Sequence, residues 1–378
     1  MKIRSMISLV ILVMTVLSLA QVIKGVEVRE WALKNGEDRF SFVVFGDTRP
    51  LSRNTPIPEP FLDRVFEEIS WLRPDFVIHM GDIVYGFGES AETIKGEYED
   101  FLRIYKDRAG DIPMIVVPAN HELQPGERAF KLFKEYFGGE LYYDFRFGSS
   151  HFIVLNTNFP KSMRGFRTKY GFYNINDGFH DEGMVDWFTE VITQEASHTF
   201  VFSHVPLFTV RGEVYENADP TFMSLIKDVD AYITAHRHFT YFSREGKVHL
   251  FVVGGGGTSL DRYVLGKCDV IHQGYECGPL GIYSYLLVDV TPVGVKYKII
   301  VPFSVDVMEK SGKIYVINRT RYDLTFRGIG VEKEDLKATL IMENGVFMPH
   351  GFKLERSGKN MRAVVWVPAH SVVVLKSK

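Results

Sequence analysis

Residues of the types that bind metal ions follow a series of short apolar runs in this sequence. Their side chains are carboxylates, an amide and imidazoles, with one phenol nearby. In chain order they are Asp47, Asp82 with Tyr85, Asn120 followed by His121, His204, and the pair His236 and His238. Carboxylate and imidazole ligands accept iron, manganese and zinc alike. Any one of these residues alone is more often a turn residue or a satisfied histidine, but the whole series favours one shared metal site.

The apolar runs that precede these residues have the composition of buried strands. They are rich in β-branched and aromatic residues and end in polar or glycine-containing turns, which is typical of strands covered on both faces. The runs lie at 41–47, 75–82, 114–121, 151–158, 199–206, 231–238 and 248–257. Because the carboxyl ends of strands line the ligand crevice of an open α/β sheet, side chains distant in the chain can converge there.

Helical patterns separate several of these strands. Residues 59–72 repeat apolar side chains at the spacing of a helix with one buried stripe, and residues 127–137 and 182–192 behave similarly. Alternating strand and helix predicts an α/β core. Beyond about residue 300 apolar and polar residues alternate with little sign of helix, which predicts an appended antiparallel β module. We therefore expect residues 26–300 to form the catalytic domain and residues 301–378 a smaller all-β module.

The N-terminal segment has the features of an export signal. Lys2 and Arg4 precede an apolar run at 6–20, and polar Gln21 follows it, as in secretory signal peptides. The run is short for a membrane span, which needs roughly 20 residues. Residues 1–25 are therefore interpreted as a signal peptide, with an uncleaved membrane anchor or a buried helix as alternatives. The sequence predicts a secreted or cell-envelope protein that contacts a membrane only through an uncleaved N-terminus.

The composition argues against two broad classes of protein. Hydrophobic residues make up 46% of the chain and charged residues 24%, which is typical of a globular protein rather than a disordered one. The formal net charge is −3, although residues 1–25 contain only basic charges. The remainder is therefore mildly acidic and gives no electrostatic reason to expect nucleic-acid binding.

Two features concern covalent modification after export. Cys268 and Cys277 could form a disulfide that closes a short loop, or they could remain free thiols. Asn318 begins an Asn-Arg-Thr triplet, which is a formal acceptor for N-glycosylation.

The series GD, GDIVY, ANHE, SHVP and AHRH, over roughly residues 40–260, resembles the motif set of the calcineurin-like metallophosphoesterases. Tyr85 stands three residues after Asp82 and His204 ends the segment VFSH. These details resemble the GDxxY and VxxH motifs of the purple acid phosphatase branch in particular. Ala119 and Ala235 stand where the general pattern has glycine. The resemblance implies a four-layer α/β/β/α sandwich, a centre of two metal ions and hydrolysis of phosphoesters.

The resemblance also implies a ligand set for each ion. The first would be held by Asp47, Asp82, Tyr85 and His238, and the second by Asp82, Asn120, His204 and His236. Two cations roughly 3.5–4 Å apart would activate a bound hydroxide and neutralise both ends of an in-line displacement at phosphorus. A phenolate ligand favours a strongly Lewis-acidic ion such as Fe³⁺, so iron is expected beside Tyr85 and manganese, zinc or iron in the other position. The alternative interpretation of Tyr85 is a packing aromatic.

Two residues are candidates for direct action on the substrate. His121 would steady the phosphoryl oxygens or protonate the leaving alkoxide, and Glu122 is the candidate residue to orient it. Arg49 stands where many relatives have a metal-binding histidine, and a guanidinium cannot bind a metal. It could hold a substrate phosphate oxygen, or it could pair with a nearby carboxylate and serve only structure.

Three other features are interpreted as structural. His79 and His151 lie in or at the start of apolar runs and are expected to be satisfied core histidines. The glycines at 254–257 are not followed by the Lys-Ser/Thr of a nucleotide-binding loop, so a close approach of backbone to the metal site is the better explanation.

The leading prediction is an extracytoplasmic phosphomonoesterase acting on small phosphate esters. A phosphodiesterase or nucleotide hydrolase that uses the same metals is one alternative. The other is a non-catalytic, metal-binding envelope protein whose C-terminal module binds a partner.

Overall fold

The computed structural model describes residues 22–138, 140–158, 182–208, 210, 219–261, 276–357 and 360–377. Residues 1–21, which carry the apolar run of the predicted signal, lie outside these ranges, and so does Cys268. Across the described ranges, no helix combines the length and the apolar character that a membrane span requires.

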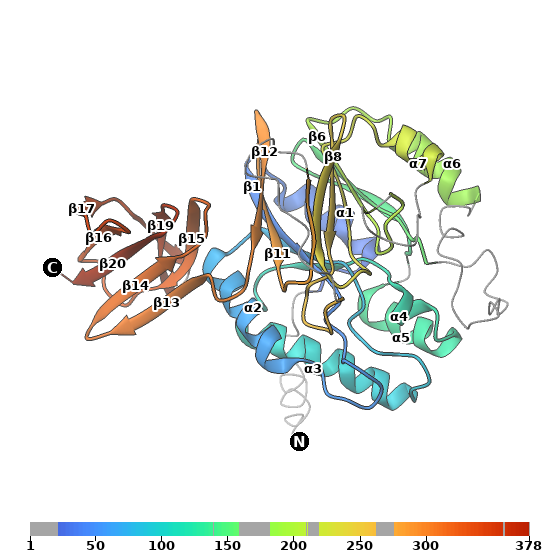
Figure 1. Ribbon diagram of the computed structural model, residues 1–378, viewed down its shortest axis with the longest axis horizontal. Helices are drawn as coiled ribbons and strands as arrows, with labels where there is room; N and C mark the ends of the chain where they lie inside the picture. Colours follow the sequence, from blue (N-terminus) through green and yellow to red (C-terminus); the bar gives the residue numbers. More distant parts are fainter. Residues whose placement is uncertain are drawn as a thin grey trace, which may run out of the picture.

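Two sheets form the centre of the α/β part (Figure 1). In the described residues the first sheet has the order β12-β11-β1-β2-β3 and the second the order β10-β8-β9-β7-β6-β5-β4. The strands of the first are β1 (Phe40–Phe45), β2 (Phe76–His79), β3 (Met114–Val116), β11 (Tyr285–Thr291) and β12 (Gly294–Ile300). Those of the second are β4 (Tyr143–Phe147), β5 (Ser150–Val154), β6 (His198–Phe202), β7 (Ala231–Thr234), β8 (Thr240–Glu245), β9 (Val248–Val253) and β10 (Glu276–Leu280).

Parallel pairing aligns the strand ends that carry the candidate residues. Strands β1, β2 and β3 are parallel to one another, and so are β5, β6, β7 and β9. Every strand predicted from an apolar run is present. The carboxyl ends within each parallel set therefore open at a common edge, where polar loops can meet.

The helices are α1 (Gly25–Asn35), α2 (Glu59–Leu72), α3 (Ala91–Ala109), α4 (Asn120–Leu123), α5 (Glu127–Phe137), α6 (Glu182–Val191) and α7 (Pro220–Leu225). The helices predicted at 59–72, 127–137 and 182–192 are confirmed. The long helix α3 was not predicted; it begins after Ser90, whose side chain caps it by accepting a hydrogen bond from the backbone N–H of Thr93.

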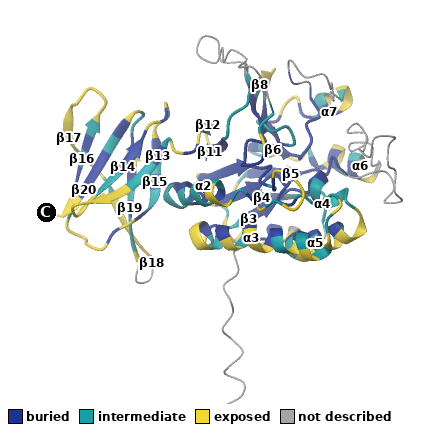
Figure 2. Ribbon diagram, turned by 60° about the horizontal axis from the view of Figure 1, so that its bottom comes forward, coloured by how far each residue is buried: buried dark blue, intermediate teal, exposed yellow. Residues whose placement is uncertain are grey.

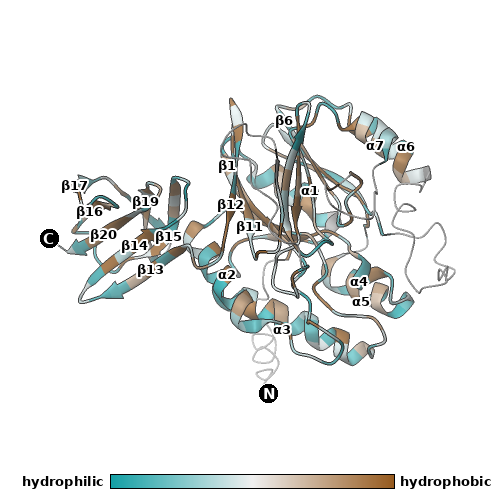
Figure 3. Ribbon diagram, in the orientation of Figure 1, coloured by the Kyte–Doolittle hydropathy of each residue, from teal (hydrophilic) through white to brown (hydrophobic). Residues whose placement is uncertain are grey.

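Side chains alternate along β1 between two hydrophobic cores. Phe42 and Val44 join the core between the two sheets, whereas Val43 and Phe45 join the core shared with α2 and α3. A third core lies on the outer face of the second sheet, under α6 and α7. Strands β1, β2, β3 and β5 are accordingly buried along their lengths (Figure 2), and the central strands are mostly hydrophobic (Figure 3). This arrangement of helices, sheet, sheet and helices confirms the predicted four-layer sandwich.

The C-terminal residues form two further antiparallel sheets, ordered β13-β14-β20-β16-β17 and β15-β19-β18 in the described residues. Their strands are β13 (Val305–Lys310), β14 (Lys313–Asn318), β15 (Leu324–Gly330), β16 (Leu336–Met342), β17 (Phe347–His350), β18 (Lys353–Ser357), β19 (Asn360–Val367) and β20 (Ser371–Ser377). This all-β module packs against α2 through β15 and β13, where Arg64 donates to the carbonyl of Val305 at 2.5 Å. The predicted all-β character is confirmed.

The triplet at Asn318 is not available as a glycosylation site in the folded chain. The Asn318 side chain is buried, and its Nδ2 donates to the carbonyls of Tyr322, Val367 and Pro368 at 2.8–3.0 Å. The amide nitrogen that would carry a glycan is instead used in a hydrogen bond between Asn318, at the end of β14, and Val367, at the end of β19.

Candidate metal centre

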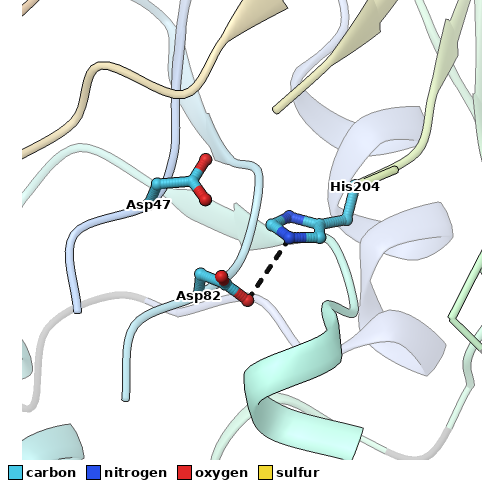
Figure 4. A group of neighbouring side chains, drawn as sticks. All are labelled: Asp47, Asp82 and His204. Atoms are coloured by element: carbon cyan, nitrogen blue, oxygen red, sulfur yellow. Dashed lines mark ion pairs between the residues drawn. The ribbon is translucent and has the colours of Figure 1, made fainter. Parts of the chain in front are cut away.

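The candidate ligands meet between the two sheets, at the carboxyl ends of their strands. Asp47 follows β1, Asp82 follows β2, and Asn120 begins α4 after β3, so the first sheet supplies these three. The second sheet supplies His204, after β6, and His236 and His238, after β7. Figure 4 shows Asp47, Asp82 and His204 turned toward one another, with ligand atoms that all lie within 4.8 Å of each other.

Three further candidate ligands, Asn120, His236 and His238, lie against these three. The Oδ1 of Asn120 lies 2.9 Å from both His204 Nε2 and His236 Nδ1. His204 Nε2 is also 3.3 Å from Asp82 Oδ1, and His238 Nε2 is 3.4 Å from Asp47 Oδ1. These ligands, which come from positions as far apart as 47 and 238 in the sequence, are therefore close enough to share bound ions.

The hydrogen-bonding pattern of this cluster fits a cation. His204 Nδ1 must donate to the carbonyl of Met80, 2.7 Å away, because a carbonyl oxygen only accepts. In the neutral ring, Nε2 then presents a lone pair toward the oxygens of Asp82 and Asn120, which are acceptors as well. Asp47 Oδ1 is buried and has no hydrogen-bond partner among the described residues. A bound cation would satisfy all of these lone pairs.

Without a metal, a proton balances part of this negative charge. Burial alone would lower the pKa of His204, but the carboxylate of Asp82, with help from Asp47, outweighs burial and raises that pKa to about 9. Burial lowers the pKa of His236 well below its ordinary value, so this ring is neutral and can offer a lone pair. Metal ligands must be deprotonated, so cation binding would displace the proton from His204.

Three of the candidate ligands adopt an unusual backbone conformation. Asp47, Asp82 and His236 have φ values of 61°, 57° and 67°, in the left-handed region that costs non-glycine residues of order 1–3 kcal/mol each. Hydrogen bonds hold the strained turns: Asp47 N–H donates to Gly81 O, and His236 N–H donates to Asp47 Oδ2, both at 3.0 Å. Such strain is typical of sites where the direction of a side chain matters more than stability.

The prediction that Glu122 orients His121 is wrong. The Glu122 carboxylate is buried and accepts hydrogen bonds from the backbone N–H groups of Asp82 (3.0 Å) and Ile83 (2.7 Å). It therefore fixes the strained turn that presents Asp82. The backbone carbonyl of Tyr85 holds His121 instead, by accepting from His121 Nδ1 at 2.5 Å.

His121, Arg49 and Tyr85 lie together beside Asp82. His121 Nε2 is 3.8 Å and Arg49 Nε 3.7 Å from Asp82 Oδ2. The guanidinium of Arg49 also lies 5.6 Å from the centre of the Tyr85 ring, and the rings of Tyr85 and His121 are in edge contact. The contact of Arg49 with Asp82 is compatible with either predicted role, since 12% of the Arg49 side chain remains exposed.

Of the residues interpreted as structural, His79 is satisfied as predicted, whereas His151 is satisfied at one ring nitrogen only, because its buried Nδ1 has no hydrogen-bond partner among the described residues. His79 is buried, donates from Nε2 to Thr48 Oγ1 at 3.1 Å and accepts from Gly81 N–H. His151 is buried and its Nε2 lies 3.0 Å from Asp144. A Cβ at position 254 would stand 2.8 Å from Asp47 Oδ2 and 2.1 Å from the carbonyl of Arg237. Glycine is required there because backbone passes directly against the site.

One strand end was predicted without a candidate residue. The run at 151–158 ends in Asn156, Thr157 and Asn158, which are buried next to the loops that carry His204 and Asn120. The sequence signal was present, because three consecutive polar residues end an apolar strand.

Comparisons with known proteins agree with this site. The sequence model of the family described as calcineurin-like phosphoesterase matches residues 40–239, which include Asp47, Asp82, Asn120, His204 and His238. The rat serine/threonine-protein phosphatase CPPED1 is 27% identical over 138 residues, which are 36% of this chain and 41% of that one. This chain thus spans less than half of the length of that relative.

Similarity to solved structures concerns the fold alone. GAP50, described as the anchor in the inner membrane complex of Plasmodium, superposes with a TM-score of 0.50 at 14% identity, covering 75% of this chain and 89% of that one. A dimetal phosphatase from Danio rerio gives a TM-score of 0.44 at 13% identity, over 69% of this chain and 99% of that one.

Proposed function

Because this chain belongs to the calcineurin-like phosphoesterase family, we propose that it is a metal-dependent hydrolase of phosphoesters. One observation carries the proposal: ligand atoms of Asp47, Asp82 and His204 from separate loops lie within 4.8 Å of one another in a buried cluster, with Asn120 Oδ1 2.9 Å from His204 Nε2. Protein interiors rarely gather acceptors without a donor or cation between them. Arg49 and His121, which lie 3.7 and 3.8 Å from Asp82 Oδ2, stand beside this cluster where they could contact a substrate phosphate.

The site holds two ions in this proposal, with the ligands that the family resemblance assigns and with Asp82 shared between them. When bound, the ions would lower the pKa of a water molecule and neutralise charge on the phosphoryl group. Glu122 keeps the turn at Asp82 in place through hydrogen bonds to its backbone. Asn120 Oδ1 lies 2.9 Å from both His204 Nε2 and His236 Nδ1. Arg49 binds a phosphate oxygen from the Tyr85 side, and His121 faces the same space.

The preferred substrate is a small phosphate monoester, and the protein acts outside the cytoplasm. Support for the location is the basic and apolar pattern of residues 1–25. Support for the substrate class is the GDxxY arrangement at Asp82 and Tyr85, which resembles the purple acid phosphatase branch. A phosphodiesterase or nucleotide hydrolase with the same ions is the competing activity.

Elemental analysis of metal-loaded protein, combined with hydrolysis of matched phosphate mono- and diesters, tests the function. We expect two ions per chain and a higher kcat/KM for the monoester. A clear preference for the diester would overturn the monoesterase assignment. Two bound ions with no turnover of any ester would favour a non-catalytic role.

Replacement of Tyr85 by phenylalanine tests the iron assignment. Iron-loaded protein is expected to be purple through phenolate-to-iron charge transfer, and Tyr85→Phe is expected to lose that absorption band. The ring contacts with Arg49 and His121 survive the change, because only the hydroxyl is removed. Visible spectra of both proteins at equal iron content are the measurement. A colourless parent, or a variant that stays purple, would remove Tyr85 from the ligands.

A further inference from the structure

Two ligands of one predicted ion come from different sheets. Asn120 follows β3 of the first sheet and His204 follows β6 of the second. The sheets meet through apolar side chains, whose attraction is non-directional, whereas hydrogen bonds have preferred distances and angles. The 2.9 Å distance between Asn120 Oδ1 and His204 Nε2 therefore needs polar contacts that span the two layers.

The polar turn after β5 holds the loop that carries His204. Thr157 Oγ1 accepts from the backbone N–H of Val205 at 3.0 Å and donates to the carbonyl of Val205 at 3.2 Å. Both backbone groups of the residue after His204 are thus bound by a single hydroxyl. Thr157 is buried, so water does not compete for these bonds.

The same turn reaches the loop that carries Asn120. Asn158 Nδ2 donates to the carbonyl of Pro118 at 3.1 Å, two residues before Asn120. Asn156 Oδ1 accepts from the backbone N–H of Asn158 at 3.0 Å and so shapes the turn. Consecutive residues of the second sheet therefore bind both the His204 loop and, across the sheets, the Asn120 loop.

The turn retains polar residues at an energetic cost. Asn156 Nδ2 and Asn158 Oδ1 are buried and have no hydrogen-bond partner among the described residues. An unsatisfied buried polar group costs about 1–3 kcal/mol. If this turn served only to end β5, smaller or apolar residues in place of Asn156 and Asn158 would avoid this cost.

We propose that Asn158 and Thr157 are positioning residues that set the spacing between Asn120 and His204, and so the affinity for the ion that these two ligands share. This inference rests on the proposed function, because it concerns an ion of the same site. Replacement of residues that hydrogen-bond to metal ligands and orient them typically weakens metal binding roughly 10–100-fold. Loss of either contact removes one of the hydrogen bonds that position the two loops without removing any ligand, while the bond from His204 Nδ1 to Met80 O remains.

Manganese binding by the full chain tests the inference, with no need for turnover. Equilibrium dialysis over a range of free Mn²⁺, followed by elemental analysis, gives the number of ions bound per chain, and a fit with two sites gives the two affinities. For Asn158→Leu and Thr157→Val we expect one of two ions to bind roughly tenfold more weakly, with the affinity for the other within twofold of the parent. Thr157→Ser keeps the hydroxyl and is expected to bind both ions like the parent.

The matched control is Thr320→Val in the C-terminal module. Thr320 is also buried, and its hydroxyl also exchanges hydrogen bonds with the backbone of one residue, Tyr322. This variant is expected to bind both ions like the parent, even if its thermal stability falls as far as that of Thr157→Val.

Two results would overturn the positioning role. One is parental affinity for both ions in Asn158→Leu and Thr157→Val; the other is equal weakening of both ions, which indicates general loosening of the fold. A parent protein that binds no manganese, zinc or iron would instead refute the proposed function itself. The two failures are therefore distinguishable.

Discussion

Asp82→Asn is expected to lose both ions at concentrations that saturate the parent, and with them nearly all hydrolysis. Asp82 lies between the two halves of the site: its Oδ1 is 3.3 Å from His204 Nε2, and its Oδ2 faces Arg49 and His121. An amide has no charge and one oxygen fewer, so it cannot bridge two cations. Loss of several kcal/mol of electrostatic stabilisation corresponds to a decrease of roughly 10³-fold or more in kcat/KM.

Asp82→Asn is expected to keep the fold of the parent, because asparagine can adopt the backbone conformation of this position. Asp82 has a φ of 57°, and asparagine is among the few residues that adopt this conformation readily. The N–H group at position 82 still donates to Glu122, so the turn is kept. Asp144→Asn, which alters a carboxylate paired with His151 outside the site, is the control. Two ions and parental turnover in Asp82→Asn would contradict the shared-ligand role.

His121→Ala is expected to keep both ions and to lose roughly 10²–10⁴-fold in kcat, the usual contribution of a positioned acid or base. The ring is held by Tyr85 O through Nδ1, which leaves Nε2 facing the site. Burial lowers the pKa of His121 to about 4, so the ring is neutral near pH 7. His121 can therefore protonate the leaving alkoxide only if the negative charge of a bound phosphate raises the pKa of the ring.

His121→Asn separates the two roles considered for this residue. Its amide can still donate a hydrogen bond but cannot transfer a proton at neutral pH. If His121 only steadies the phosphoryl oxygens, His121→Asn should recover part of the activity lost in His121→Ala. If it protonates the leaving group, both variants should be equally slow with poor leaving groups. Parental kcat in His121→Ala, at equal metal content, would refute both roles.

Helices and strands were predictable where one residue pattern dominated. The stripe of apolar residues in α2 gave its boundaries, and the continuous apolar run of β1 gave a strand buried on both faces. Helix α3 was missed because charged residues dilute its apolar positions and Gly96 interrupts them. The pairing of β1 with β11 has no local signal, since it joins Phe40 to Val290.

The candidate ligands were predictable for a different reason. Their types are chemically specific, and they stand at strand ends that the α/β pattern brings together. The task of Glu122 was not predictable, because its partners are backbone N–H groups, which every residue possesses. Burial of Asn318 was hidden for the same reason: its acceptors are main-chain carbonyls, and two of the three, those of Val367 and Pro368, come from a segment far along the chain.

The position of β11 has a consequence for how the chain folds. Strand β1 is sandwiched between β2, which follows it closely, and β11, which is synthesised after every candidate ligand. Until β11 emerges from the ribosome, the backbone N–H and C=O groups along one edge of β1 have no partner strand and could pair with another chain. Nearly the whole polypeptide must be present before the first sheet closes, so this protein has high contact order and is expected to fold slowly. Such a late-closing chain depends on protection from aggregation during synthesis more than on the stability of its finished core.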